Sequence, residues 1–302
     1  MKFTTDSAFR KAITLPEIIL SGVILFFILL LLISRLPRAR EDSRSVSCIS
    51  NLGQIGQAML IYKQNQDSSL PMVSHWSGID AKIGSSPFSA IRQDLKIGDF
   101  IDVRAQIESK KKDVFNPEPL RVAGLRCPSD RSESASTATN YRANTGVNAR
   151  GESGPFSIGQ VNRLNKIETA DGLSFTAAFS ERLIGDGTQK LSINNYLQFD
   201  ICQEAVAYGV NGNSIQQDIK GDAGLDWSKG DWRNTLYHHG LTPNWRFSAI
   251  AFQDNCGQIG ASSGHLKSVN VLLLDGSVRS WKDTVDPGVW KKLGGILDGT
   301  GP

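Results

Sequence analysis

The stretch ITLPEIILSGVILFFILLLLI, residues Ile13–Ile33, decides how this chain is organised. Its last sixteen residues, Ile18–Ile33, carry no charge. As an α-helix rising about 1.5 Å per residue, residues 13–33 would reach about 31 Å, roughly the thickness of the hydrocarbon core of a bilayer. The pattern therefore predicts a long hydrophobic N-terminal helix that crosses a membrane once, as a transmembrane anchor.

A carboxylate interrupts this apolar stretch at Glu17. Forcing a carboxylate to the centre of a membrane helix costs about 2.5–3.5 kcal/mol, so such a group usually has a partner. A cut between Ala12 and Ile13 would create an α-amine four residues before Glu17. That amine could pair with the Glu17 carboxylate of a neighbouring subunit. A secretory signal fits less well, because no small-x-small cleavage site follows Ile33.

Basic residues, a small residue, a hydrophobic-Thr-Leu-x-Glu run and an apolar stretch follow one another here. This order resembles the prepilin leader of type IV pilins and type II secretion pseudopilins. The resemblance implies a leader of residues 1–12, cut after Ala12 by a prepilin peptidase that methylates the amine of Ile13. It also implies that Glu17 pairs with another pilin-like subunit during assembly. The residue before the cut is Ala rather than the usual Gly, and the residue after it is Ile rather than Phe.

Apolar residues continue at helical spacing beyond the anchor, at Val46, Ile49, Leu52, Ile55, Met59 and Tyr62. Turn-forming residues from Gln66 to Pro71 end the pattern. We therefore expect residues 13–66 to form one helix, whose second half is a stalk that packs against a globular head.

The remaining residues, 67–302, show short apolar segments separated by turn signals, which predicts one α+β head with an antiparallel sheet. Candidate strands are Leu173–Ser180, Phe247–Phe252 and Val269–Leu274. Asp275-Gly276 suits a two-residue hairpin turn after the last of these strands. Asp286-Pro287 is typical of the start of a helix.

Composition and motifs argue against several functions. The chain has 33 basic and 30 acidic residues, a net charge of +3, so we expect no nucleic-acid partner. Gly260–Gly264 fits the G-x-S-x-G pattern of α/β-hydrolases, but His265 follows Ser262 by only three residues with no acid between them. We therefore assign no catalytic residues, no enzyme activity and no resident cofactor.

Oxygen ligands in a Gly-rich loop suit Ca²⁺, so Asp222, Asp226 and Asp231 are the candidate calcium ligands.

Four cysteines, Cys48, Cys127, Cys202 and Cys256, are present. In an exported head an even number favours disulfides over buried free thiols. The number and spacing of the cysteines leave three pairings open.

Several segments are similar to those of a large bacterial prepilin-like family, the domain of unknown function 1559 type. They are Cys48-Ile-Ser-Asn-Leu-Gly-Gln-Ile55, Cys127-Pro-Ser-Asp130, Thr169–Ser174, Ala178–Arg182, Pro243-Asn244, and His265 followed after nine residues by Asp275-Gly276. The resemblance implies a pilin-like protein with no established catalysis. It favours Cys48–Cys127 as one disulfide, leaving Cys202–Cys256. It also makes His265, Asp275 and Gly276 a structural signature.

We therefore expect a structural subunit of a type II secretion or type IV pilus-like system. It would be anchored in the cytoplasmic membrane by a single pass, with its head on the periplasmic side. Its partners would be the prepilin peptidase and other pilin-like subunits. The alternative is a membrane-tethered module that binds carbohydrate or another envelope component without forming a filament. The six tryptophans of the chain leave room for that alternative.

Overall fold

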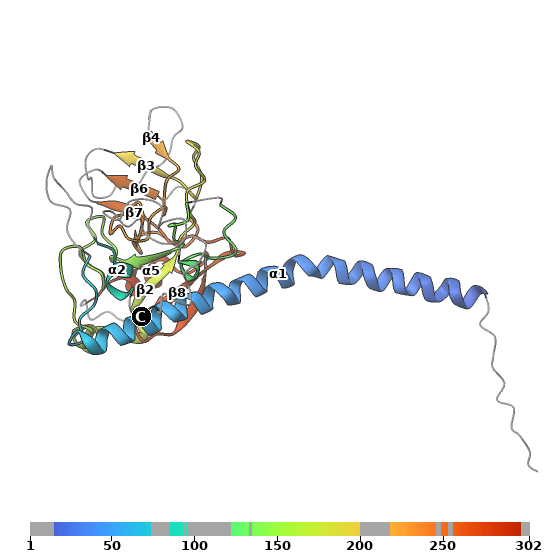
Figure 1. The fold of residues 1–302 in the computed structure, drawn as a ribbon, viewed down its shortest axis with the longest axis horizontal. Coiled ribbons are helices and arrows are strands. Elements are labelled where there is room, and N and C mark those ends of the chain that lie inside the picture. Colours follow the sequence, from blue (N-terminus) through green and yellow to red (C-terminus); the bar gives the residue numbers. More distant parts are fainter. Residues whose placement is uncertain are drawn as a thin grey trace, which may run out of the picture. The chain divides into compact units, whose positions relative to one another are not determined.

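The structure, a computed structural model, describes residues 15–73, 85–92, 95, 122–132, 135–199, 218–245, 249–252 and 256–296, with only the helical backbone given for 32–36. The chain divides into two compact units, Met1–Ser43 and Arg44–Pro302. The elements, drawn in Figure 1, are α1 (Leu15–Asn65), α2 (Pro87–Ile91), η2 (Ala123–Leu125), β1 (Tyr141–Asn144), α4 (Leu164–Ala170), η3 (Leu173–Phe175), β2 (Ala177–Glu181), β3 (Tyr196–Phe199), β4 (Asp218–Lys220), β5 (Leu236–Tyr237), β6 (Ala249–Phe252), β7 (Gly257–Ile259), β8 (Ser268–Leu273), β9 (Val278–Lys282) and α5 (Pro287–Gly294).

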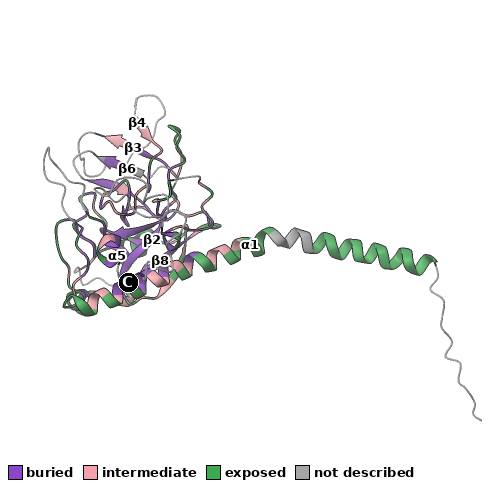
Figure 2. Ribbon diagram, in the orientation of Figure 1, coloured by how far each residue is buried: buried purple, intermediate pink, exposed green. Residues whose placement is uncertain are grey.

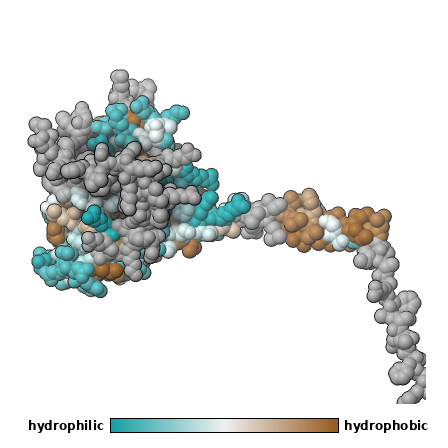
Figure 3. All heavy atoms as spheres, in the orientation of Figure 1, coloured by the Kyte–Doolittle hydropathy of each residue, from teal (hydrophilic) through white to brown (hydrophobic). Residues whose placement is uncertain are grey.

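The first unit contains the start of α1, whose apolar side chains from Leu15 to Leu31 are exposed (Figure 3). Within the described part of the chain, no helix combines the length and the apolarity needed to cross a membrane. The structure therefore contradicts the prediction of a single-pass transmembrane anchor.

In the second unit, the part of α1 from Arg44 to Asn65 packs on the head through one face. Cys48, Leu52 and Ile55 on this face are fully buried, whereas Val46 is 65% exposed. Figure 2 shows buried, intermediate and exposed residues alternating along this part of α1. Gly56 allows the close approach, because a Cβ at this position would come within 2.8 Å of Leu272 Cδ1 in β8. The predicted stripe therefore coincides with the packing face of α1 from Ile49 to Tyr62, whereas its first predicted member, Val46, lies outside that face.

Two mixed sheets form the head. The five-stranded sheet has the order β5–β1–β2–β8–β9, and the four-stranded sheet has the order β4–β3–β6–β7. The predicted α+β class with a sheet-rich head agrees with this arrangement. The expectation of an antiparallel sheet is corrected, because β1 pairs with β5 and β3 pairs with β6 in parallel. These parallel pairs join strands that are far apart in the chain, which local turn signals cannot show.

The predicted hairpin is present, but with a longer connection. β8 and β9 pair from Ser268↔Lys282 to Leu272↔Val278, and residues 274–277 connect the two strands. Asp275 Oδ1 accepts hydrogen bonds from the N–H and the Oγ of Ser277, and Gly276 has a φ of 88°. Burial raises the pKa of Asp275, but hydrogen bonds from Ser277 and Ser174 together with the charge of Arg279 outweigh it and lower this pKa. Asp275 and Gly276 thus shape this turn.

Candidate functional site

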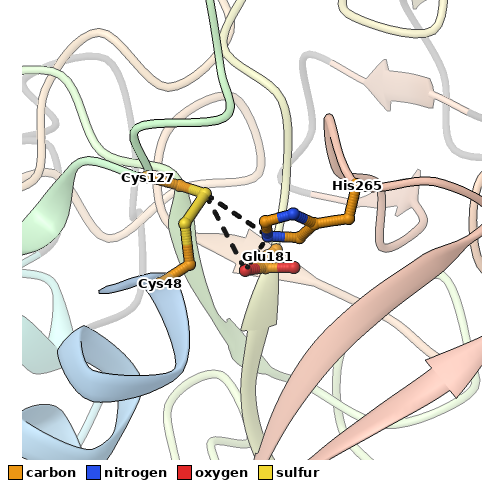
Figure 4. Close-up of side chains that lie close together, drawn as sticks. All are labelled: Cys48, Cys127, Glu181 and His265. Carbon is orange, nitrogen blue, oxygen red and sulfur yellow. Dashed lines mark hydrogen bonds and ion pairs between the residues drawn. A yellow bond between two sulfur atoms is a disulfide. The ribbon is translucent and has the colours of Figure 1, made fainter. Parts of the chain in front are cut away.

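Four side chains from separate parts of the head converge beside the sheet (Figure 4). Cys48 of α1 and Cys127, which follows η2, form a disulfide. Glu181 ends β2, and His265 lies in the loop before β8. All four are buried, and their potential ligand atoms lie within 4.8 Å of one another. We call these residues the Cys–Glu–His cluster.

Short distances define the cluster around one imidazole nitrogen. His265 Nε2 lies 3.1 Å from Glu181 Oε1 and 3.6 Å from Cys127 Sγ. Cys127 Sγ lies 3.9 Å from the same carboxylate oxygen. Because an ionised carboxylate only accepts hydrogen bonds, Nε2 donates to Glu181.

Neighbouring polar groups compensate the buried carboxylate of Glu181. Asn270 of β8 donates its backbone N–H to Oε2 at 2.8 Å and its Nδ2 to Oε1 at 3.0 Å. Burying a carboxylate is costly unless hydrogen bonds replace water, and here three donors do so. Asn270 also accepts a hydrogen bond from Ser280 of β9, which orients its side chain. The antiparallel pairing of β2 and β8 thus holds the carboxylate in place.

The Cys-Pro-Ser-Asp segment is held by Asn140. Asn140 Oδ1 accepts the N–H of Cys127 at 2.9 Å, and its Nδ2 donates to Asp130 Oδ2 at 2.5 Å. Asp130 Oδ2 also accepts the N–H of Ile184 at 2.9 Å, just after β2. One amide and one carboxylate therefore fix both ends of this segment against the sheet.

Tyr141 links the sheet to α1 beside the disulfide. Its hydroxyl donates to the carbonyl of Cys48 and accepts Nδ2 of Asn51, both at 3.3 Å. Tyr141 lies opposite Glu181 in the pairing of β1 and β2. Burial, and next the charge of Glu181, raise the pKa of Tyr141 well above its usual value, so the phenol stays protonated and able to donate. The site thus joins α1 to the five-stranded sheet by one covalent bond and by a buried polar network.

A family model described as "Protein of unknown function (DUF1559)" matches residues 37–288, which include the whole cluster. The chain belongs to this family. The resemblance seen in the sequence is confirmed at this level, whereas its prepilin-like character stays a prediction. No curated protein and no solved structure matches the chain.

The Glu-Arg pair of this DUF1559 protein lies at the end of β2, the central strand of the five-stranded sheet, and its two side chains have different partners. Glu181 belongs to the cluster, whereas the next residue, Arg182, donates to the carbonyls of Gly260 and Asn195, both at 3.3 Å. Burial lowers the pKa of Arg182 to about 10, so the guanidinium remains charged near neutral pH. Successive residues of an extended chain point to opposite sides, which explains the two roles.

The G-x-S-x-G loop of the DUF1559 protein also has a structural role. Ser262 is buried, its Oγ accepts the N–H of Leu183, and its own N–H donates to the carbonyl of Glu181. Gly264 lies so close to the preceding Cys-Pro-Ser-Asp segment that a Cβ would come within 2.3 Å of the carbonyl oxygen of Ser129. This loop places His265 over the disulfide.

The three candidate calcium ligands do not come together. In the described part of the chain, the side chains that lie close enough together to hold a metal ion are those of the Cys–Glu–His cluster, which contains none of Asp222, Asp226 and Asp231. Their carboxylates instead accept hydrogen bonds from neighbours, namely Tyr196 Oη for Asp222, Ser228 for Asp226 and Asn234 for Asp231.

The remaining predicted site residues lie away from the cluster or outside the residues that the structure describes. Ala12, Ile13 and Cys202 lie outside the described residues. Glu17 lies in the first turn of α1, and Cys256 is disulfide-bonded. Tyr141, Asn140 and Asn270 belong to the site although no motif in the sequence marks them. Nothing in their local sequence separates them from other strand residues.

Proposed function

We propose that this DUF1559 protein is a structural subunit of a type II secretion or type IV pilus-like system. In this proposal, the apolar start of α1 packs against the corresponding helices of other pilin-like subunits. A prepilin peptidase would first cut the leader after Ala12. The head would lie outside the cytoplasm.

The exposed apolar surface at the start of α1 is the observation that carries this proposal. Side chains such as Leu15 and Phe27 are 72% and 60% exposed, and the neighbouring apolar residues of Ile18–Leu31 are similarly exposed (Figure 3). A continuous apolar surface of this kind marks an interaction site. Each such side chain gains about 1.5–3 kcal/mol on full burial, so association of like helices is strongly favoured.

The two features of the second unit that support the proposal are the packing face of α1 and the disulfide. A subunit held in an assembly by its N-terminal helix must transmit force from that helix to its head. The bond between Cys48 and Cys127 makes this connection covalent. Disulfides persist in oxidising compartments, which supports a head outside the cytoplasm.

Glu17 gives the assembly a direction. A carboxylate in the first turn of a helix interacts favourably with the helix dipole. In the proposed assembly it also pairs with the α-amine of Ile13 on a neighbouring subunit. Because an ion pair surrounded by apolar helices has a low-dielectric environment, removing one partner leaves the other charge uncompensated.

Crosslinking in the native host tests the proposal. A photoreactive side chain in place of Leu25, which is exposed at the start of α1, should crosslink to another pilin-like subunit. The matched position is Leu266, which is exposed on the head and should not. Glu17→Ala should abolish the crosslink at position 25, whereas Glu168→Ala, on the exposed surface of α4, should leave it unchanged. Equal yields from wild type and Glu17→Ala would refute the assembly role, and an N-terminus other than Ile13 in mature protein would refute the processing step.

A further inference from the structure

The Cys–Glu–His cluster contains the side chains of a transition-metal site, with its two sulfur atoms bonded to each other. We propose that reduction of the Cys48–Cys127 disulfide converts the cluster into a four-coordinate site for a divalent ion of the zinc class. The ligands are the thiolates of Cys48 and Cys127, His265 Nε2 and Glu181 Oε1. The inference concerns the head alone and does not depend on the proposed assembly.

The distances between the ligand atoms already approach those of a tetrahedral site. Zinc–ligand distances of about 2.3 Å for sulfur and about 2.0–2.2 Å for nitrogen and oxygen imply separations of about 3.6 Å for S···N, 3.6 Å for S···O and 3.4 Å for N···O. The corresponding separations here are 3.6, 3.9 and 3.1 Å. Adjustments of a few tenths of an ångström would therefore bring Cys127, His265 and Glu181 around one ion. Cys48 Sγ would complete the set by rotating away from Cys127 Sγ, to which it is bonded.

The types of donor atom select the ion. Two thiolates and an imidazole favour zinc and similar transition metals over Ca²⁺ and Mg²⁺, which prefer oxygen ligands. Two thiolates and one carboxylate around a divalent ion leave a net charge of −1, the same as in a Cys₃His zinc site.

The surroundings of Glu181 suit a ligand that binds through one oxygen. Asn270 N–H donates to Oε2, the oxygen that faces away from the imidazole nitrogen. Oε1 lies 3.1 Å from His265 Nε2, and the proton between these two atoms would move to Nδ1 of the same ring when the ion binds both. Hydrogen bonds of this kind orient a ligating carboxylate and strengthen metal binding. His265 itself lies between two exposed residues of its loop, Gly264 and Leu266.

The chemistry balances with an external dithiol as the reductant. Two electrons and two protons pass from the dithiol to the disulfide, giving two cysteine thiols and a cyclic disulfide of the reagent. Binding of the ion then displaces one proton from each thiol, while the proton on His265 Nε2 moves to Nδ1, so that the neutral imidazole binds the ion through Nε2. An external disulfide reverses the exchange: it accepts two electrons from the two thiolates and becomes two thiolates itself, the Cys48–Cys127 bond forms again, and the ion is released. The metal and the disulfide are thus alternative links between α1 and the sheet.

Cobalt binding tests the site on the full-length chain. The protein is reduced with dithiothreitol, freed of the reagent without oxygen, and titrated with Co²⁺. We expect one cobalt per chain, with the visible bands of tetrahedral cobalt and a near-ultraviolet thiolate-to-cobalt band that Zn²⁺ abolishes. The oxidised protein should show neither band. Absence of these bands from the reduced protein, or equal binding by the oxidised protein, would overturn the proposal.

Variants locate the ion. Glu181→Gln should weaken cobalt binding at least tenfold, whereas Glu168→Gln, on the exposed face of α4, should not change it. Cys48→Ser/Cys127→Ser should lose the thiolate-to-cobalt band. If this double variant keeps the band, the ion lies at other thiols and the proposal is wrong. Thermal unfolding gives a second readout, which does not require the reduced protein without metal to be fully folded. Zn²⁺ should raise the Tm of the reduced wild type and leave the Tm of the oxidised wild type unchanged. An unchanged Tm of the reduced protein would overturn the proposal.

Discussion

Removing the disulfide should lower the free energy of unfolding of the second unit by about 4.5 kcal/mol. The perturbation is Cys48→Ala/Cys127→Ala, which leaves no unpaired hydroxyl in a buried place. The bond closes a loop between residues separated by 79 positions. In the chain-entropy treatment, a loop of this length restricts the unfolded chain by about 15 cal/mol/K, or about 4.5 kcal/mol at 25 °C.

The double variant should still fold, because α1 keeps its apolar contacts with the head. Leu52, Ile55 and Ala58 remain as fully buried residues on its packing face. For a domain of this size, each 1 kcal/mol corresponds to about 2–4 °C, so we expect the Tm to fall by roughly 10–15 °C.

Urea unfolding of the full-length chain, followed by tryptophan fluorescence, measures this loss. All six tryptophans lie in the second unit, between residues 76 and 290. Ser50→Ala, on the exposed face of α1 two residues after Cys48, is the control and should change the free energy of unfolding by less than about 0.5 kcal/mol. A loss below about 1 kcal/mol in the double variant would show that packing alone holds α1 to the head, and our account of the disulfide would be refuted.

Three further predictions concern the second unit. Burial lowers the pKa of His238 to about 4 and of His239 to about 3, below the value of about 6.5 in an unfolded chain. The unfolded state therefore binds more protons at acid pH, and the free energy of unfolding should fall as pH falls from about 6.5 towards 4, by up to about 1.4 kcal/mol per pH unit for each histidine. Leu52→Ala should cost about 2–5 kcal/mol in urea unfolding because Leu52 is fully buried, whereas Val46→Ala, at an exposed position of the same helix, should cost less than about 1 kcal/mol. Gly276→Ala should lower the Tm by a few degrees, since the φ of 88° suits only glycine well and a Cβ would come within 3.3 Å of Leu60 Cδ1.

Each of the three predictions, on pH, on the packing face of α1 and on Gly276, has a result that would contradict it. A free energy of unfolding that stays constant between about pH 6.5 and 5 would mean that the two histidines are not buried as neutral groups. Equal losses for Leu52→Ala and Val46→Ala would mean that the packing face of α1 is assigned wrongly. An unchanged Tm in Gly276→Ala would mean that the turn adapts to a side chain.

Local signals predicted the local elements of the head. Asp286 accepts the N–H groups of Gly288 and Val289 at the start of α5, as expected from the Asp-Pro sequence. The candidate strand of residues 173–180 was right in its second half only. Leu173–Phe175 forms a 3₁₀ turn after Gly172, whose φ is 82°, and β2 begins at Ala177. Composition alone cannot separate a short turn from the strand that follows it.

The candidate site was predictable only in part. Cys48, Cys127 and His265 stood out in the sequence because each belongs to a recognisable motif. Glu181 was visible only as part of a Glu-Arg motif, and its contact with His265 joins residues 84 positions apart. Asn270 and Tyr141 belong to strands whose local sequences carry no sign of a partner.

By itself, the sequence determined the long N-terminal helix, the helical stripe that packs on the head, the α+β class and the family. These depend on residue spacing and on short-range hydrogen bonds, which act within a few positions of the chain. The parallel pairing of β1 with β5 and the Cys–Glu–His cluster were decided only in the tertiary structure. Both depend on which distant segments of the chain meet. Where α1 packs on the sheet, the carboxylate of Glu181 is buried, and it needs hydrogen-bond donors there because burying a carboxylate without them costs much free energy.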